Sequence, residues 1–236
     1  MSLRVDSLTR MVGQNVEDSY GRVLGVLVSL NSDVDGNIKY IEVKVEDRGL
    51  EVIPGDRASL KDGKLIVTPT WKYEALKLIE ALDRAYRRRK AVESISTNTD
   101  IQAEIIEDLK RNLSEEIKNL KIKAEEVKRI IKDRITAIED EGLQISRSIV
   151  NIQTLYFSGE LSEKNYTQSI NHLRKLREKL LEEKNDAKRT LDKLEKTIEA
   201  ATSPLEVKKP EKIEQQQKQD QPQVTVQPVV VKVEGA

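Results

Sequence analysis

Apolar residues recur along this chain with two different spacings, and the spacing changes near residue 69. Before that point it is the spacing of β-strands. Residues 23–30 form a nearly continuous apolar run of strand length, and residues 38–45 alternate apolar and polar positions. Alternation with a period of two is typical of a strand that is buried on one face. Residues 1–69 are therefore predicted to form a β domain.

Turn sequences that contain glycine separate the predicted strands. Residues 35–37 follow the first apolar run, and Asp62 with Gly63 joins residues 56–60 to residues 64–68. Pairs of this kind favour tight hairpin turns. About five short strands in this space predict a small closed or half-closed barrel, because closure hides strand edges that would otherwise pair with other chains.

The first residues allow two interpretations. Residues 2–12 lead into the first barrel strand, or they form a short amphipathic helix with Leu3, Leu8, Met11 and Val12 towards a bilayer. The amphipathic pattern of this segment is modest, so the lead into the strand is favoured.

From residue 70 the spacing becomes that of α-helices. Helices are predicted over residues 70–96, 100–157 and 162–201, within a helical region of residues 70–201, and Thr70 and Ser162 are candidate N-caps. Steps of three and four between apolar residues give the heptad seam of a coiled coil. The predicted seam residues are Leu113, Ile117, Leu120, Ala124, Val127, Ile131, Ile138, Ile145 and Ile152, then Ile170, Leu173, Leu176, Leu180, Ala187, Leu191, Leu194 and Ile198.

The lengths of the last two helices suggest how they pack. The short connector over residues 158–162 favours antiparallel packing of the two against each other. The third helix is shorter than the second and cannot cover it completely. The uncovered part, near residues 100–117, is predicted to contact another subunit, which predicts an oligomer.

Two charged residues, Arg134 and Glu141, interrupt the seam of the second helix. Such an interruption more often indicates control of the register, or a local flaw, than a functional site. Gly142 follows the interruption and permits a bend.

The end of the chain differs from everything before it. Residues 202–223 are rich in Pro, Gln, Lys and Glu and are predicted to be a disordered linker, and residues 224–236 read as a strand. A strand with no neighbour is suited to completing the sheet of a partner by β-augmentation. The alternative is a merely disordered tail. The residues that would fill the partner's pockets are Val224, Val226, Val229, Val230, Val231 and Val233.

Composition narrows the class of function. Charged residues make up 35% of the chain and aromatic residues 3%, a bias typical of coiled coils. There is no cysteine and His172 is the only histidine, so no catalytic residue, metal ligand or cofactor site is predicted. No apolar run approaches the length of a membrane span, and no signal peptide is evident. We expect an intracellular, soluble protein that is not an enzyme.

One basic cluster stands out although Lys and Arg together balance Asp and Glu at 41 each. Three interpretations remain open: a solvated helix face, contacts to nucleic-acid phosphates, or attraction to anionic lipid headgroups. The residues of this cluster are Arg84, Arg87, Arg88, Arg89 and Lys90.

A family resemblance follows from these segments. Residues 12–25 resemble the opening of PRC-barrel domains, with glycines that end short strands. The order of barrel, coiled coil, Pro/Gln linker and terminal strand resembles the CdvA family of archaeal cell-division proteins. The resemblance implies an α+β fold, in which a PRC-like β-barrel is followed by a long antiparallel coiled coil and a disordered tail that ends in a strand.

The resemblance also implies a function. CdvA proteins associate with membrane and DNA, and their terminal strand docks onto the winged-helix-like domain of CdvB, an ESCRT-III homologue. We therefore expect a filament-forming scaffold at the mid-cell division site, on the inner face of the membrane, that recruits CdvB. The alternative is a nucleoid-associated protein that polymerises on DNA through the basic cluster.

Overall fold

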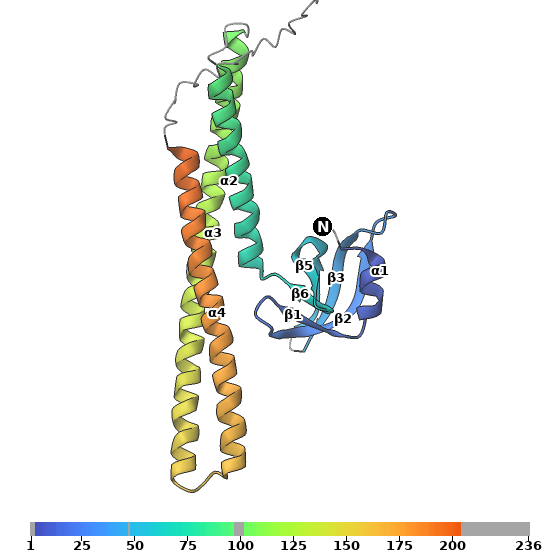
Figure 1. Cartoon of the computed structure of the whole chain (residues 1–236), viewed down its shortest axis with the longest axis vertical. Helices are drawn as coiled ribbons and strands as arrows, with labels where there is room; N and C mark the ends of the chain where they lie inside the picture. Colours follow the sequence, from blue (N-terminus) through green and yellow to red (C-terminus); the bar gives the residue numbers. More distant parts are fainter. Residues whose placement is uncertain (1–2, 47, 97–101, 204–236) are drawn as a thin grey trace, which may run out of the picture. The chain divides into compact units, whose positions relative to one another are not determined.

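A computed structural model describes residues 3–46, 48–96 and 102–203. Within these ranges a six-stranded sheet with short helical turns precedes three long helices, so the predicted α+β class is confirmed (Figure 1). The long helices are α2 (Thr70–Ile95), α3 (Ala103–Phe157) and α4 (Glu163–Thr202).

The sheet, which we call the barrel because it occupies the place of the predicted barrel, has the strand order β4-β3-β2-β1-β6-β5. Its hydrogen-bonded order ends at β4 and β5 and does not close into a complete ring within the described residues. Its neighbouring strands are antiparallel except β1 and β6, which are parallel. One strand, β4, was not predicted, because its side chains are almost all exposed and show no burial pattern. The strands are β1 (Asn15–Asp18), β2 (Val23–Ser32), β3 (Ile38–Val45), β4 (Gly49–Pro54), β5 (Ala58–Lys61) and β6 (Lys64–Val67).

The start of the described chain leads into β1, as the favoured interpretation expected, but it does so through helical turns. A short helix, α1 (Val5–Leu8), and one 3-10 turn, η1 (Thr9–Met11), precede β1. Leu8 and Met11 are buried against the inner residues of the sheet, such as Val16 and Leu27. Because these two side chains complete the core of the sheet, they do not form a face towards a bilayer.

The hairpin between β5 and β6 follows the predicted turn chemistry. Asp62 and Gly63 both have positive φ angles, of 49° and 73°. Positive φ at both central residues is what a two-residue type I′ turn requires.

A close approach of two strands fixes a glycine at residue 25. A Cβ atom at Gly25 would lie 2.2 Å from the backbone oxygen of Lys44, on the neighbouring strand β3. The backbone of β3 cannot easily move away, because β3 is paired with strands on both sides.

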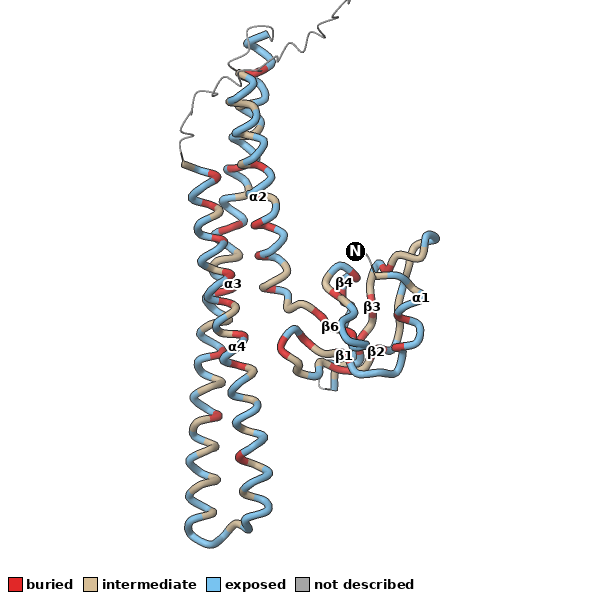
Figure 2. Tube along the Cα trace, viewed as in Figure 1, coloured by how far each residue is buried: buried red, intermediate tan, exposed pale blue. Residues whose placement is uncertain are grey.

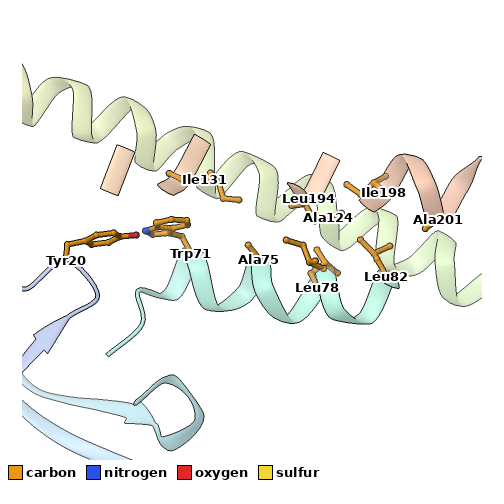
Figure 3. Close-up of a cluster of buried hydrophobic side chains, with 12 residues drawn as sticks. Tyr20, Trp71, Ala75, Leu78, Leu82, Ala124, Ile131, Leu194, Ile198 and Ala201 are labelled. Carbon is orange, nitrogen blue, oxygen red and sulfur yellow. The ribbon is translucent and has the colours of Figure 1, made fainter. Parts of the chain in front are cut away.

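The three long helices pack together around one apolar core. Side chains of α2, α3 and α4 point into a common space, among them Leu82, Ala124 and Leu194 (Figure 3). Buried residues recur along α3 and α4 (Figure 2). Beyond this core, a smaller cluster of Ile138, Ile145 and Leu180 involves buried residues of α3 and α4 only.

The packing of α2 bears on the oligomer that was predicted from the unequal lengths of the last two helices. α2 packs against α3 over a segment that α4 was not long enough to cover. Glu93 of α2 forms an ion pair with Lys110 of α3 at 3.1 Å, and Ile106 and Ile117 of α3 are buried within the chain. The prediction that this segment needs another subunit is therefore wrong.

The ends of the helices agree only in part with the predicted caps. Ser162 is the N-cap of α4, and its hydroxyl accepts a hydrogen bond from the backbone N–H of Asn165 at 3.4 Å. Thr70 is not a cap: Pro69 occupies the cap position of α2, and Thr70 is the first helical residue.

We predict that Gly25→Ala destabilises the protein by about 1–3 kcal/mol, because the added methyl group must displace the backbone of β3. Urea denaturation would measure the effect, with Ser29→Ala on the same strand as the matched control. An equal midpoint for both variants would contradict the close approach of β2 and β3.

Candidate functional site at the junction of barrel and helices

The charged residues that interrupt the heptad seam pair with each other, and Arg134 also pairs with α4. Arg134 donates from Nε and Nη2 to the two carboxylate oxygens of Glu183, each at 2.8 Å. Its Nη1 donates to Glu141, also at 2.8 Å. Paired hydrogen bonds between guanidinium and carboxylate fix relative orientation as well as charge. The interruption is therefore a specific polar layer between α3 and α4, and α3 continues through Gly142 as one helix.

Glu183 is the centre of this layer. Its side chain is 1% exposed, and it accepts hydrogen bonds from three directions. Besides Arg134, the indole Nε1 of Trp71 on α2 donates to it at 3.2 Å, and Nη2 of Arg22 lies 2.7 Å from it. Arg22 belongs to the turn between β1 and β2, so one buried carboxylate links the barrel to all three long helices.

The charges around Glu183 keep it ionised. Burial by itself raises the pKa of the Glu183 carboxyl, but the hydrogen bonds and charges of Arg134 and Arg22 outweigh burial. The net shift of the pKa is downward. A carboxylate in this state acts as a fixed negative charge and not as a proton donor.

The turn between β1 and β2 is built to aim Arg22 at the helices. Asp18, which is almost fully buried, accepts hydrogen bonds from the backbone N–H groups of Tyr20 at 2.8 Å and Arg22 at 2.9 Å. It also accepts one from Nε of Arg22 at 2.6 Å. Gly21 has a φ of 72°, which lets the chain turn back within this short distance.

A second set of contacts lies beside the first. The Tyr20 hydroxyl donates to Asp186 of α4 at 2.7 Å, and Nζ of Lys72 lies 2.6 Å from the same carboxylate. Figure 3 shows Tyr20 and Trp71 lying next to each other in this region. Burial and the neighbouring Asp186 raise the pKa of the Tyr20 hydroxyl. Burial raises the pKa of Asp186, but hydrogen bonds from Lys72 and Tyr20 outweigh it and the net shift is downward.

The sequence contained one signal for Glu183. The apolar steps of α4 pass from Leu180 to Ala187 with one position left out, and Glu183 occupies that position. A missing apolar step in one helix and charged residues on the seam of the other indicate a shared polar layer. Asp18 and Arg22 had no comparable signal, because they lie in a turn.

The residues of the basic cluster on α2 have different surroundings in the structure. Arg89 donates to the backbone oxygens of Ala201 at 2.9 Å and Ser203 at 3.0 Å, so it caps the end of α4. Arg84 and Arg87 are exposed and lie near Glu80 and Asp83 on their own helix, at 3.8 and 3.2 Å. Arg88 and Lys90 are exposed too, and binding of phosphate or lipid by any of the five stays a prediction.

The remaining predictions concern His172, the strand at the end of the chain, a membrane span and a metal site. His172 is exposed on α4. The predicted partner-binding strand, residues 224–236, lies outside the described residues. Across the described ranges, no helix combines the length and apolar character needed to cross a membrane. The same ranges contain no group of three or more His, Asp or Glu side chains placed to hold a metal ion.

Comparison with known proteins places these segments in a family. The model of the CdvA-like coiled-coil domain matches residues 70–220, from the first residue of α2 to a point beyond α4. The chain belongs to the CdvA family. It is 34% identical over 197 residues to Cell division protein A of Sulfolobus acidocaldarius, which covers 83% of this chain and 82% of that protein. The CdvA resemblance expected from the order of segments is therefore confirmed.

We predict that Glu183→Ala destabilises the protein by about 3 kcal/mol at pH 7, the low end for a broken buried ion pair. Arg22 and Arg134, about one-quarter exposed, each lose one carboxylate partner and keep the other, Asp18 or Glu141. Glu139→Ala is the matched control: Glu139 pairs with Lys184 at 2.9 Å and is half exposed, so its loss costs less than about 1 kcal/mol. Urea denaturation measures both. Equal losses would contradict a central role for Glu183.

The carboxylates of the junction give the stability of the protein a defined pH dependence, which urea denaturation at a series of pH values measures. The folded-state pKa values of Glu183 and Asp186 are lowered, so the stabilisation from their ionised forms is complete above the unfolded values, about 4.3 and 3.9. It is lost as the pH falls through the lower folded values. Stability should therefore fall below about pH 4 in the wild type and fall less steeply in Glu183→Gln.

Proposed function

We propose that this protein is a non-enzymatic scaffold for cell division. It assembles into filaments, associates with the membrane and recruits the ESCRT-III homologue CdvB through residues 224–236. The observation that carries the proposal is the family match over residues 70–220, together with a relative named for cell division that aligns with 83% of the chain. The role in cell division itself rests directly on this match.

The junction supports a structural role. Each of its four carboxylates lies within hydrogen-bond distance of a cationic side chain. The four belong to Asp18, Glu141, Glu183 and Asp186. Carboxylates held in this way fix the barrel turn on the helices and are poorly suited to transferring protons. A scaffold needs a fixed relation between the parts that assemble, and buried ion pairs can supply it.

The recruiting role rests on the tail sequence. Alternating valines suit the side-chain pockets of a host sheet, while the backbone of an added strand supplies the hydrogen bonds. Pro228 is compatible with an edge position, where it withholds one N–H. A flexible linker of some 20 residues has a root-mean-square span of about 25 Å. This span lets a bound partner assemble beside the scaffold.

We predict that deleting residues 222–236 abolishes binding to the winged-helix-like domain of CdvB and leaves self-association unchanged. A sharper variant is Val230→Pro with Val231→Pro, which removes backbone donors from the strand and should weaken binding at least about tenfold. Gln217→Pro in the linker is the matched control. Isothermal titration calorimetry measures the affinities, and normal binding by the deleted chain would refute the recruiting role.

A nucleoid-associated role is the second candidate, and one observation favours it. Arg84, Arg87 and Arg88 are exposed on one side of α2, spaced three and four residues apart. Residues three and four apart are neighbours on a helix surface, so the three guanidinium groups can contact successive phosphates. Anionic lipid headgroups would present the same chemistry.

We predict that Arg84→Glu, Arg87→Glu and Arg88→Glu together weaken DNA or anionic-vesicle binding and flatten its salt dependence. Arg89 is left unchanged because it caps α4. The control changes Arg174, Lys175 and Arg177 to Glu, which alters the net charge by the same amount on α4. Electrophoretic shifts and vesicle co-sedimentation, each with a salt titration, provide the readout. Equal losses in both variants would indicate only a general charge effect.

A further inference from the structure

The barrel and the long helices have separate apolar cores. The core of the barrel includes Leu27 and Ile41 and contains no residue of the three long helices. The core of the helices includes Leu82 and Leu194, and in the described chain Tyr20 is its one buried member from before α2. Two parts of a chain with separate cores are expected to move relative to each other unless a large apolar interface joins them. Other contacts must therefore hold the barrel on the helices.

The contacts that join the two parts are hydrogen bonds and ion pairs between the turn before β2 and α4. They are Arg22 with Glu183 at 2.7 Å, the hydroxyl of Tyr20 with Asp186 at 2.7 Å, and the backbone oxygen of Gly21 with Nζ of Lys179 at 2.5 Å. The ring of Tyr20 adds an apolar contact beside Trp71 (Figure 3). Because water can replace the partners in polar contacts, a boundary of this kind opens at a lower cost than an apolar one.

Three charged groups at this boundary each have a second partner on their own side. These partners are Arg134 for Glu183, Asp18 for Arg22, and Lys72 for Asp186, at 2.8, 2.6 and 2.6 Å. The fourth charged group, Nζ of Lys179, belongs to a partly exposed residue, so water can solvate it. Opening the boundary therefore leaves no buried charge without a partner. An unpaired buried charge is what makes the loss of an ordinary buried ion pair costly.

The chain crosses from the barrel to α2 through one short connection. Thr68 is held to the barrel, because its backbone oxygen accepts hydrogen bonds from Nε and Nη2 of Arg57 at 3.2 and 3.1 Å. Pro69 belongs to the helix, because its backbone oxygen accepts from the N–H groups of Lys72 and Tyr73. The two parts thus meet between adjacent residues. A hinge requires changes in only a few backbone dihedral angles, and this connection can supply them.

One exposed contact lies beside this connection. Asp56, in the 3-10 turn η2 (Gly55–Arg57), accepts hydrogen bonds from the Tyr73 hydroxyl and from Nζ of Lys77 at 3.2 Å. The Asp56 and Lys77 side chains are 55% and 59% exposed, and exposed ion pairs contribute little to stability. This contact joins the barrel to the first turns of α2 and does not hold the turn before β2 on α4.

We propose that the turn of residues 20–22 is a latch, which leaves α4 as a unit while both apolar cores stay folded. In the closed state Arg22 lies on Glu183 and Tyr20 on Asp186. In the open state the barrel swings about the connection between Thr68 and Pro69. Opening changes the orientation of the barrel relative to the helices and breaks neither part. The inference does not depend on the proposed function.

The first test compares the opening of the latch with the unfolding of the helices in the full-length protein. The chain has no cysteine, so Lys61→Cys on β5 and Lys175→Cys on α4, both at exposed positions, accept a pair of dyes. Energy transfer between the dyes reports the position of the barrel, and circular dichroism reports the helices. We expect energy transfer to change at a lower urea concentration than circular dichroism. Coincident transitions would overturn the inference, because they indicate a single cooperative unit.

Trp71 provides a second readout that needs no dye. It is the only tryptophan of the chain, and Tyr20 lies beside it (Figure 3). Opening uncovers one side of its indole ring, so its emission should shift to longer wavelength in the same step as energy transfer. Protection of the β2 and β3 amides from hydrogen exchange checks that the barrel stays folded in that step. Loss of this protection would mean that the barrel unfolds, and the inference would be wrong.

The second test weakens the latch with substitutions. Tyr20→Phe with Arg22→Gln removes two of its contacts and should raise the ratio of open to closed protein at least about tenfold. Lys179→Gln changes no barrel residue and should raise the ratio in the same direction. Lys184→Gln is the matched control, because it removes one positive charge from α4 and its partner Glu139 is on α3. Ratios equal to the wild type in both latch variants, or an equal rise in the control, would overturn the inference.

Discussion

The arrangement of this molecule depends on one buried carboxylate. Glu183 is held by Arg134 from α3, Trp71 from α2 and Arg22 from the turn between β1 and β2. An apolar residue at this position would pack the helices but would remove the ion pair to Arg22, leaving the turn tied to α4 by contacts such as the hydrogen bond from Tyr20 to Asp186. Replacing a buried ion pair by apolar residues is often neutral for stability, so we infer that the value of this one lies in specifying a single arrangement of the helices and the turn.

This constraint divides the helical region into two parts with different properties. On one side of the polar layer α2, α3 and α4 share a core that includes Leu78, Leu82 and Leu194. On the other side α3 and α4 continue as a pair, with half-buried seam residues such as Ile149 and Leu176. The first part contacts the turn between β1 and β2 through the polar layer, and the buried cluster of the second part comes from α3 and α4.

The sequence predicted what depends on local patterns. Heptad steps predicted α3 and α4, Ser162 was a correct cap, and Asp62 with Gly63 predicted a hairpin. It failed where the outcome depends on distant partners. The sequence could not tell that α2 folds back on α3, or that Arg89 is engaged by the end of α4, because neither leaves a periodic signal. Glu183 left only a missing apolar step, and β4 left none because its side chains face solvent.

The cap that Arg89 places on α4 has a mechanical consequence. The carbonyl groups of Ala201 and Ser203, which Arg89 holds, are the last points of the described chain before the tail begins. A pull on the tail is therefore received by α2 as well as by α4. Load applied by a bound polymer would be shared between two helices at their point of attachment, and α4 would resist being peeled away from its end.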